Sequence, residues 1–113
     1  MATLRLGDTA PDFTQDSTQG TINFHDWIGN SWCVLFSHPA DFTPVCTTEF
    51  VGLAKAADKF AGMGCALLAL SVDSLYSHFA WVRAIRDHFG EEIRFPIIED
   101  PTLVIGKAYG MVA

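Results

Sequence analysis

The hydrophobic positions of the chain fall into short runs separated by longer periodic stretches. Residues 32–36 and 65–72 are nearly uninterrupted apolar runs, which are typical of strands covered on both faces of a sheet. Residues 95–98 form a third, shorter run. Residues 14–24 carry turn-forming residues at 17–20, a pattern that predicts a small hairpin. The sequence therefore predicts three short strands after an N-terminal hairpin.

The stretch after the first apolar run has helical spacing. Thr43 and Pro44 suit the cap and the first position of a helix, and Gly62 and Gly64 suit its end. The residues expected on its inner face are Cys46, Glu49, Phe50, Leu53, Ala54, Ala57, Phe60 and Ala61. The pattern predicts a long helix with a cysteine in its first turn.

Two further helices and one helical turn are expected. Residues 73–74 can cap a helix that ends at Gly90. Residues 100–101 repeat the pairing of a cap with proline and predict a last helix that ends at Gly110, and residues 25–28 can form one turn. The inner face of the helix after residue 74 is expected to hold Leu75, Phe79, Val82, Ile85 and Phe89.

Strands that alternate with helices predict an α/β layer fold with parallel neighbouring strands. The 113 residues fit one domain. The chain stops at residues 111–113, directly after a predicted helix, where this rhythm calls for another strand. We therefore expect a fold that is incomplete at the C-terminus, with the strand at 95–98 left without an expected neighbour.

Composition and charge narrow the possible partners. The net charge is −6, and the seven Lys and Arg residues do not cluster, which argues against binding to nucleic acids or anionic membrane surfaces. The sequence has neither a membrane-spanning apolar run nor a signal-peptide pattern at its start. We expect a cytoplasmic protein with reduced thiols. Three cysteines without a C-x-x-C pair predict neither a disulfide framework nor a metal site.

Cys46 falls at the third position of the predicted helix. There the backbone N–H groups are unpaired and the positive end of the helix dipole is close, so the thiolate is favoured over the thiol. The hydroxyl of Thr43 lies within one turn and can hydrogen-bond the sulfur or the group that it attacks. Pro39 and Pro44 lack an N–H and can form walls, while His38 lies where a strand ends.

Other interpretations of the cysteines stay open from position alone. Cys46 can be a buried structural residue, because free cysteine is among the most buried residue types. A dithiol enzyme would need a second cysteine where Glu49 stands, and a tyrosine-phosphatase loop would need arginine where Gly52 stands. We interpret Cys33 and Cys65, inside apolar strands, as structural. The histidines His25, His78 and His88 are expected at the surface or at helix caps.

Residues 37–49 resemble the active-site segment of a peroxiredoxin. Pro39, Thr43 and Cys46 match the family's P-x-x-x-T-x-x-C motif. Thr47 follows the cysteine, as in the one-cysteine subfamily, whereas two-cysteine members usually have proline there. Further stretches that resemble the family lie at 6–13, 95–101 and 108–111, so the resemblance spans essentially the whole chain.

The resemblance implies a thioredoxin-like fold of three α/β/α layers, of which residues 1–113 would be the N-terminal portion of the catalytic domain. It also implies a peroxidase in which the Cys46 thiolate attacks a hydroperoxide and becomes sulfenic acid. The Thr43 hydroxyl and the Cys46 N–H would hold the peroxide oxygens. Pro39 would shield the sulfenate, His38 would orient the thiol or its reductant, and Glu49 would brace the site.

The resemblance implies an external reductant, either a thiol or ascorbate, no cofactor, and a homodimer of the full-length protein. Family members also use an arginine from a strand that would follow residue 113, and a resolving cysteine could follow there as well. Without that arginine, two alternatives to a turning-over peroxidase remain. One is a redox sensor that is oxidised once at Cys46, and the other is a truncated domain with no independent activity.

Overall fold

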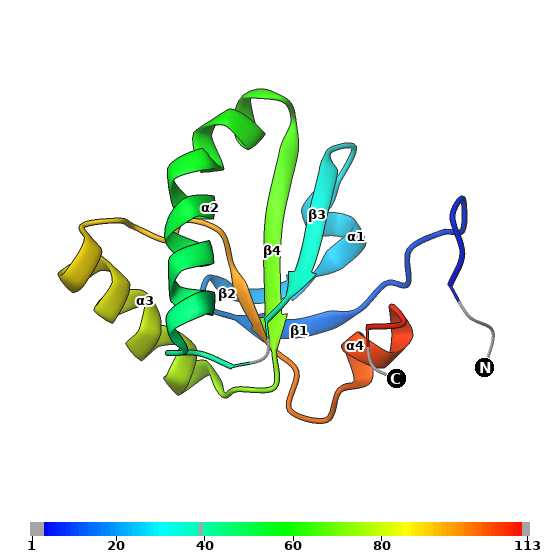
Figure 1. Ribbon diagram of the computed structural model, residues 1–113. Coiled ribbons are helices and arrows are strands. Elements are labelled where there is room, and N and C mark those ends of the chain that lie inside the picture. Colours follow the sequence, from blue (N-terminus) through cyan, green and yellow to red (C-terminus); the bar gives the residue numbers. More distant parts are fainter. Residues whose placement is uncertain (1–3, 39, 112–113) are drawn as a thin grey trace.

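The N-terminal hairpin and three parallel strands join into one mixed sheet with helices on both faces, as the computed structural model shows (Figure 1). The structure describes residues 4–38 and 40–111. The elements in chain order are β1 (Thr14–Ser17), β2 (Gly20–Asn23), α1 (Phe24–Ile28), β3 (Trp32–Ser37), α2 (Pro44–Gly62), β4 (Cys65–Ser71), α3 (Leu75–Phe89), β5 (Ile97–Glu99) and α4 (Val104–Ala108).

The strand order in the sheet is β2-β1-β5-β4-β3. β4 pairs in parallel with both β3 and β5, and β5 pairs antiparallel with β1 where Ser17 faces Ile98. The backbone N–H of Thr18 adds a hydrogen bond of 3.0 Å to the carbonyl of Ile97. The prediction that the third strand lacks a neighbour was therefore wrong, because the hairpin folds back and covers that edge.

Each face of the sheet has its own buried cluster. α2 and α3 cover one face with Phe50, Trp81 and Ile85, which pack on Leu67 and Ile97 of the strands. On the other face the cluster consists of Ile22, Phe24, Leu68, Leu70, Ile98 and Ile105, beside which Trp27 of α1 and Tyr109 pack. The predicted three-layer α/β/α arrangement is confirmed, and no helix of the described residues is long and apolar enough to cross a bilayer.

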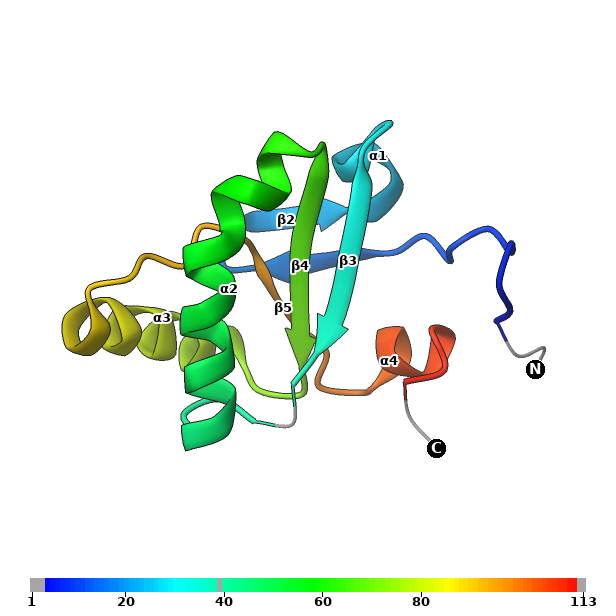
Figure 2. The ribbon, with the colours of Figure 1, turned by 45° about the horizontal axis from the view of Figure 1, so that its top comes forward.

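β3 is an edge strand, although its apolar sequence predicted burial on both faces. Figure 2 shows α2 lying along β4, with β3 as the outer strand of the sheet. The side chain of Trp32 is consequently 79% exposed, and Val34 is also exposed. Cys33 and Leu35 point to the opposite face, where they pack against the second cluster. Uninterrupted hydrophobicity therefore indicated the strand but not its place in the sheet.

α3 turns a different face inward from the predicted one. His78, Trp81 and Ile85 are its buried residues, whereas Phe79 and Phe89 are about half exposed. Polar contacts fix this orientation, since the indole N–H of Trp81 donates to the hydroxyl of Thr47 at 3.0 Å. The expectation that His78 lies at the surface was wrong, because both of its ring nitrogens have partners inside the protein.

α4 begins later than the pairing of Asp100 with proline predicted. Pro101 and Thr102 form a turn, and Leu103 precedes the helix with a φ of 64°. The buried carboxylate of Asp100 accepts the backbone N–H groups of Ile105 at 3.1 Å and Gly106 at 2.8 Å. Asp100 thus does cap the helix, but across the intervening turn.

Candidate active site

The start of α2 places Cys46 in the protein interior at the predicted position. Thr43 is the residue before the helix, with φ −75° and ψ 144°, and Pro44 is its first residue. The first hydrogen bond of the helix joins the N–H of Thr47 to the carbonyl of Thr43 at 2.9 Å. Cys46 is therefore in the first turn, near the positive end of the dipole. It is buried in one cluster with Phe50 and Trp81.

Thr43 and Glu49, two other residues of the predicted site, differ in their surroundings. The Thr43 hydroxyl donates to the carbonyl of Ala40 at 3.2 Å and makes no side-chain cap hydrogen bond to α2. Glu49 is exposed and lines a shallow hollow of about 400 Å³ with Pro44, Val45 and Thr48. Pro39 lies outside the described residues. The roles expected for these residues stay predictions.

His38 directly follows β3 and belongs to a buried polar chain. Its Nε2 lies 2.6 Å from Oδ1 of Asp41, and Oδ2 of that carboxylate lies 2.6 Å from Nδ1 of His78. Nε2 of His78 lies 3.1 Å from the carbonyl oxygen of Ile98 on β5. The chain therefore joins β3, the loop before α2, α3 and β5. We call His38, Asp41 and His78 the buried relay.

The relay adjoins Cys46 through shared aromatic neighbours. The ring of His38 lies 4.9 Å from that of Phe50 and 5.0 Å from that of Trp81, centroid to centroid. These two aromatic residues are in the same buried cluster as Cys46. His38 therefore lies beside the buried cluster that contains Cys46, and its expected role in orienting the thiol or its reductant stays a prediction.

Asp41 is the electrostatic centre of this arrangement. Burial by itself would raise the pKa of its carboxyl group. Hydrogen bonds from His38, His78 and Ser77, together with the charge of His78, outweigh burial and hold the pKa well below its usual range. The backbone N–H of Asp41 also donates to Oδ2 of Asp73 at 2.8 Å, which fixes the loop. Asp41 is therefore an ionised carboxylate inside the protein.

Asp41 and His78 are the residues that the sequence analysis missed. Asp41 lies inside the quoted motif but was given no role, and His78 was assigned to the surface. One signal was available for His78, since residues 78, 81 and 85 follow helical spacing and Trp81 and Ile85 are apolar. The partner of His78 is 37 residues away, so no local pattern reveals it.

The buried relay is also the one group of three potential metal ligands found among the described residues. One ligand atom from each of His38, Asp41 and His78 lies within 4.8 Å of the others. The facing nitrogens and oxygens are already joined by hydrogen bonds of 2.6 Å. A metal ion would have to replace both protons, so the donor set fits a hydrogen-bonded chain better than a metal centre.

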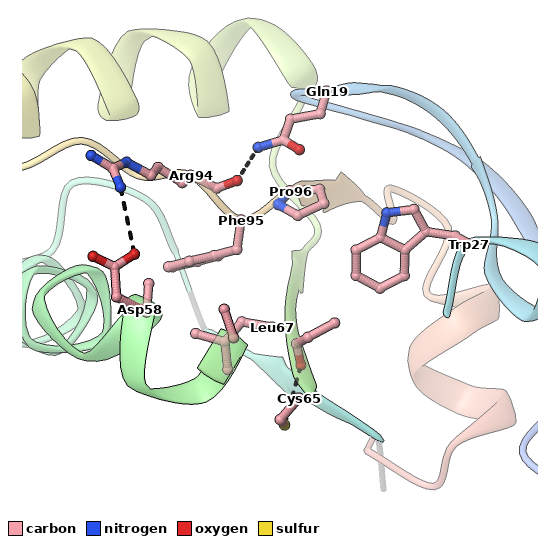
Figure 3. Close-up of a pocket in the computed structure, with 11 residues that line it drawn as sticks. Gln19, Trp27, Asp58, Cys65, Leu67, Arg94, Phe95 and Pro96 are labelled. Atoms are coloured by element: carbon pink, nitrogen blue, oxygen red, sulfur yellow. Dashed lines mark hydrogen bonds and ion pairs between the residues drawn. The ribbon is translucent and has the colours of Figure 1, made fainter. Parts of the chain in front are cut away.

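A cavity of about 280 Å³ lies where β4 begins, at the end of the sheet opposite to the buried relay (Figure 3). Its walls are mostly apolar and include Trp27, Leu67 and Phe95. At its rim the Asp58 carboxylate lies 3.5 Å from the Arg94 guanidinium, and both side chains are largely exposed. Cys65 lines this cavity, but no residue of the predicted site does.

The two other cysteines are free thiols in the strands. Burial, with a smaller contribution from nearby Cys65, raises the pKa of the Cys33 thiol to about 11. Their register places Cys65 opposite Trp32 and Cys33 opposite Ala66, so the two sulfurs project to opposite faces of the sheet. This geometry is consistent with structural roles for both residues.

The fold and the site together define a thioredoxin-like α/β domain with a buried cysteine in the first turn of a helix. The chain belongs to the AhpC/TSA family, whose family model matches residues 6–113. A peroxiredoxin of Aquifex aeolicus is 53% identical over 108 residues, covering 96% of this chain and 49% of the relative. A 1-Cys peroxiredoxin of Dictyostelium discoideum is 46% identical over 109 residues, covering 96% and 45%.

Solved structures agree with these relatives. A yeast mitochondrial 1-Cys peroxiredoxin matches with a TM-score of 0.91 and 45% identity, covering 97% of this chain and 52% of that structure. A cysteine-to-serine mutant of peroxiredoxin 6 from Arenicola marina matches with a TM-score of 0.88 and 42% identity, covering 95% and 50%. The predicted resemblance and the predicted fold are confirmed. The chain spans about half the length of the curated relatives it matches.

Proposed function

We propose that this protein is a thiol-dependent peroxidase that reduces hydrogen peroxide and organic hydroperoxides at Cys46. The observation that carries the proposal is the position of Cys46 in the first turn of α2, in one buried cluster with the aromatic neighbours of His38. Membership of the AhpC/TSA family supports the same chemistry. Residues 1–113 would form the N-terminal portion of the catalytic domain.

The proposed reaction has two stages. The Cys46 thiolate attacks the terminal oxygen of the hydroperoxide, the O–O bond breaks, and water or an alcohol leaves after taking up a proton. Cys46 is then a sulfenic acid, oxidised by two electrons. An external thiol attacks this sulfur and releases water, and a second thiol displaces the mixed disulfide to restore Cys46.

We propose the roles of the surrounding residues from the match to the family's motif. The N–H of Cys46 is directed out of the first turn and would bind a peroxide oxygen. The Thr43 hydroxyl would bind the other oxygen, exchanging its bond to the carbonyl of Ala40 for one to the substrate. His38 would orient the thiol or the reductant, Pro39 would shield the sulfenic acid, and Glu49 would brace the first two turns of α2 from outside.

The proposed partners are a hydroperoxide and a thiol reductant, with ascorbate as another donor, in a homodimer of the full-length protein. A related solved structure is described as a yeast mitochondrial protein that uses glutathione and thioredoxin systems. A thiol is therefore the reductant to test first. We keep the cytoplasm as the proposed compartment.

The test is peroxide consumption with dithiothreitol as the reductant. We expect wild-type protein to consume many equivalents of peroxide per chain and Cys46→Ser to fall to the rate of buffer alone. Cys65→Ser is the matched control, because it removes a thiol at the far end of the sheet, and it should retain the wild-type rate.

Three outcomes would contradict the proposal. Equal consumption by wild type and Cys46→Ser would exclude Cys46 as the nucleophile. Consumption that stops after one equivalent, with reductant still present, would indicate a redox sensor. No consumption by folded wild-type protein would indicate that this length of chain has no independent activity.

A further inference from the structure

His78 has an acceptor on each side of its ring, although it is 0% exposed. Nδ1 faces the Asp41 carboxylate at 2.6 Å and Nε2 faces the Ile98 carbonyl at 3.1 Å. A carboxylate and a carbonyl can only accept hydrogen bonds, so both nitrogens of His78 must donate. An imidazole has two N–H groups only as the imidazolium ion. His78 is therefore a buried cation.

His38 has the opposite requirement. Its Nε2 faces the same carboxylate at 2.6 Å and must donate. Its Nδ1 is buried and has no hydrogen-bond partner among the described residues. A neutral His38 with its proton on Nε2 leaves a lone pair on Nδ1, where it can accept the proton of an O–H or S–H group. Nothing in the relay requires a second proton on this ring.

The negative charge of the Asp41 carboxylate is neutralised within the relay by a cationic His78. The ion pairs of Asp41 among the described residues are with the two histidines and not with Lys or Arg. The other charged side chains with hydrogen bonds to the loop before α2 or to the start of α3 are carboxylates, while Arg86 and Arg94 pair with Asp87 and Asp58 elsewhere. Asp73 accepts the N–H of Asp41, and Glu99 accepts the N–H of Leu75 at the start of α3. A buried carboxylate needs one opposite charge, and a single cation at His78 lets His38 stay neutral.

We infer that His78 is a positioning residue for the proposed peroxidase: it neutralises Asp41, so that His38 keeps Nδ1 as a free proton acceptor. This inference rests on the proposed function for its catalytic meaning. His38 also lines a mostly apolar cavity of about 280 Å³ between the ends of β3 and β4 and α4, with Ser37, Leu70 and Gly106. Nδ1 itself is buried, so this acceptor suits a neutral thiol or hydroperoxide that gives up its water and donates an S–H or O–H hydrogen bond.

Replacing His78 by an uncharged residue should change the protonation of His38. In His78→Gln the amide can still donate to Asp41, but it carries no charge. The positive charge that the carboxylate requires must then come from His38, which takes up a second proton on Nδ1 and is no longer an acceptor. A merely structural defect would have no such effect on the protonation of His38.

The first test is a long-range ¹H–¹⁵N correlation spectrum of protein labelled with ¹⁵N-histidine. In the wild type we expect both nitrogens of His78 and Nε2 of His38 at protonated positions, and Nδ1 of His38 at the unprotonated position. In His78→Gln we expect the Nδ1 signal of His38 to move to the protonated position. His88→Gln, an exposed change on the same helix, is the control and should leave the relay signals unchanged.

The second test is the pH profile of peroxide turnover. We expect His78→Gln to be slower than wild type by roughly 10²-fold at neutral pH, the lower end for loss of a general base. Its rate should recover as the pH rises and His38 loses the extra proton. A rate that is lowered equally at all pH values would overturn the positioning role.

Other results would overturn the inference directly. These are a neutral His78 in the wild-type spectrum, or His38 signals that do not change in His78→Gln. Stoichiometric binding of added Zn²⁺ that shifts both histidines would make the relay a metal site instead. If His78→Gln does not fold, the wild-type spectrum still decides the protonation states. If wild type lacks turnover, the proposed function fails, while the spectra still support or refute the relay.

Discussion

The two ends of the parallel strands hold charge in different ways. At the carboxyl ends, Asp41 is buried between His38 and His78, and its oxygens lie 2.6 Å from a nitrogen of each. At the amino end of β4, the pair of Asp58 and Arg94 lies at the rim of an apolar cavity, at 3.5 Å and in contact with water (Figure 3). Both are carboxylate–cation pairs, and burial is what separates them.

The two pairs differ in how strongly each group depends on its partner. Water screens the pair at the amino end, so neither partner depends on the other. The side chains of the relay are buried, so each group fixes the protonation and direction of the next. Such fixed groups are what the proposed reaction at Cys46 needs, because an acceptor works only in one protonation state.

Removing Asp41 should therefore have the largest effect on stability. Asp41→Ala leaves two buried histidines without their common acceptor and removes the side-chain hydrogen bonds that tie the loop before α2 to α3. We expect the free energy of unfolding to fall by about 3–5 kcal/mol, as for other broken buried pairs. Urea titration followed by circular dichroism measures this change.

Asp58→Ala is the matched control at the other end of the sheet. It removes the same chemical group from an exposed pair, so we expect a loss of less than about 1 kcal/mol. Equal losses in the two variants would show that burial of the relay contributes nothing to the stability of the protein.

Local sequence patterns were sufficient for most of the fold. Two predicted features are confirmed: the hairpin of Thr14–Ser17 with Gly20–Asn23, and the start of α2 at Pro44. Both could be predicted because turn residues and proline act on their immediate neighbours in the chain. The place of β3 at the sheet edge and the inward face of α3 were missed. Both depend on which elements meet in space, and apolar periodicity does not record that.

The site was predictable to a similar extent. The motif placed Cys46, Thr43 and His38 around one helix start, and the fold brings them there. His78 could not be assigned, since its burial depends on an acid 37 residues earlier and a carbonyl 20 residues later. A histidine in a sequence shows neither its partners nor its protonation, and these decide whether it can be buried.

Acid should reduce the stabilisation by the buried relay more than the stabilisation by the exposed pair of Asp58 and Arg94. The pKa of Asp41 is lower in the folded protein than the value of about 3.9 expected for the unfolded chain. Its stabilisation is therefore complete above that value and is lost as the pH falls below it. We expect wild type to lose up to about 1.4 kcal/mol per pH unit more than Asp41→Asn below pH 4. Urea midpoints between pH 6 and 2.5 test this.

Asp58→Asn serves as the reference for that titration, because Asp58 is exposed and its partner is screened. Its stability should follow the wild-type pH dependence within error. If Asp41→Asn follows it as well, the carboxylate of Asp41 is not held ionised by the fold, and the charge balance of the buried relay is wrong.

The smallest effect is expected at the amino end of β3, where the structure disagrees with the apolar sequence. Trp32→Thr keeps a residue that favours strands and removes a ring that is mostly exposed. We expect a change in unfolding free energy within about 0.5 kcal/mol, whereas Leu68→Ala in the fully buried centre of β4 should cost about 2–5 kcal/mol. A loss above about 1.5 kcal/mol for Trp32→Thr would mean that the indole is covered in solution. Repeating the urea titration at several protein concentrations would then show whether a second copy covers it, since only contact between chains makes the midpoint depend on concentration.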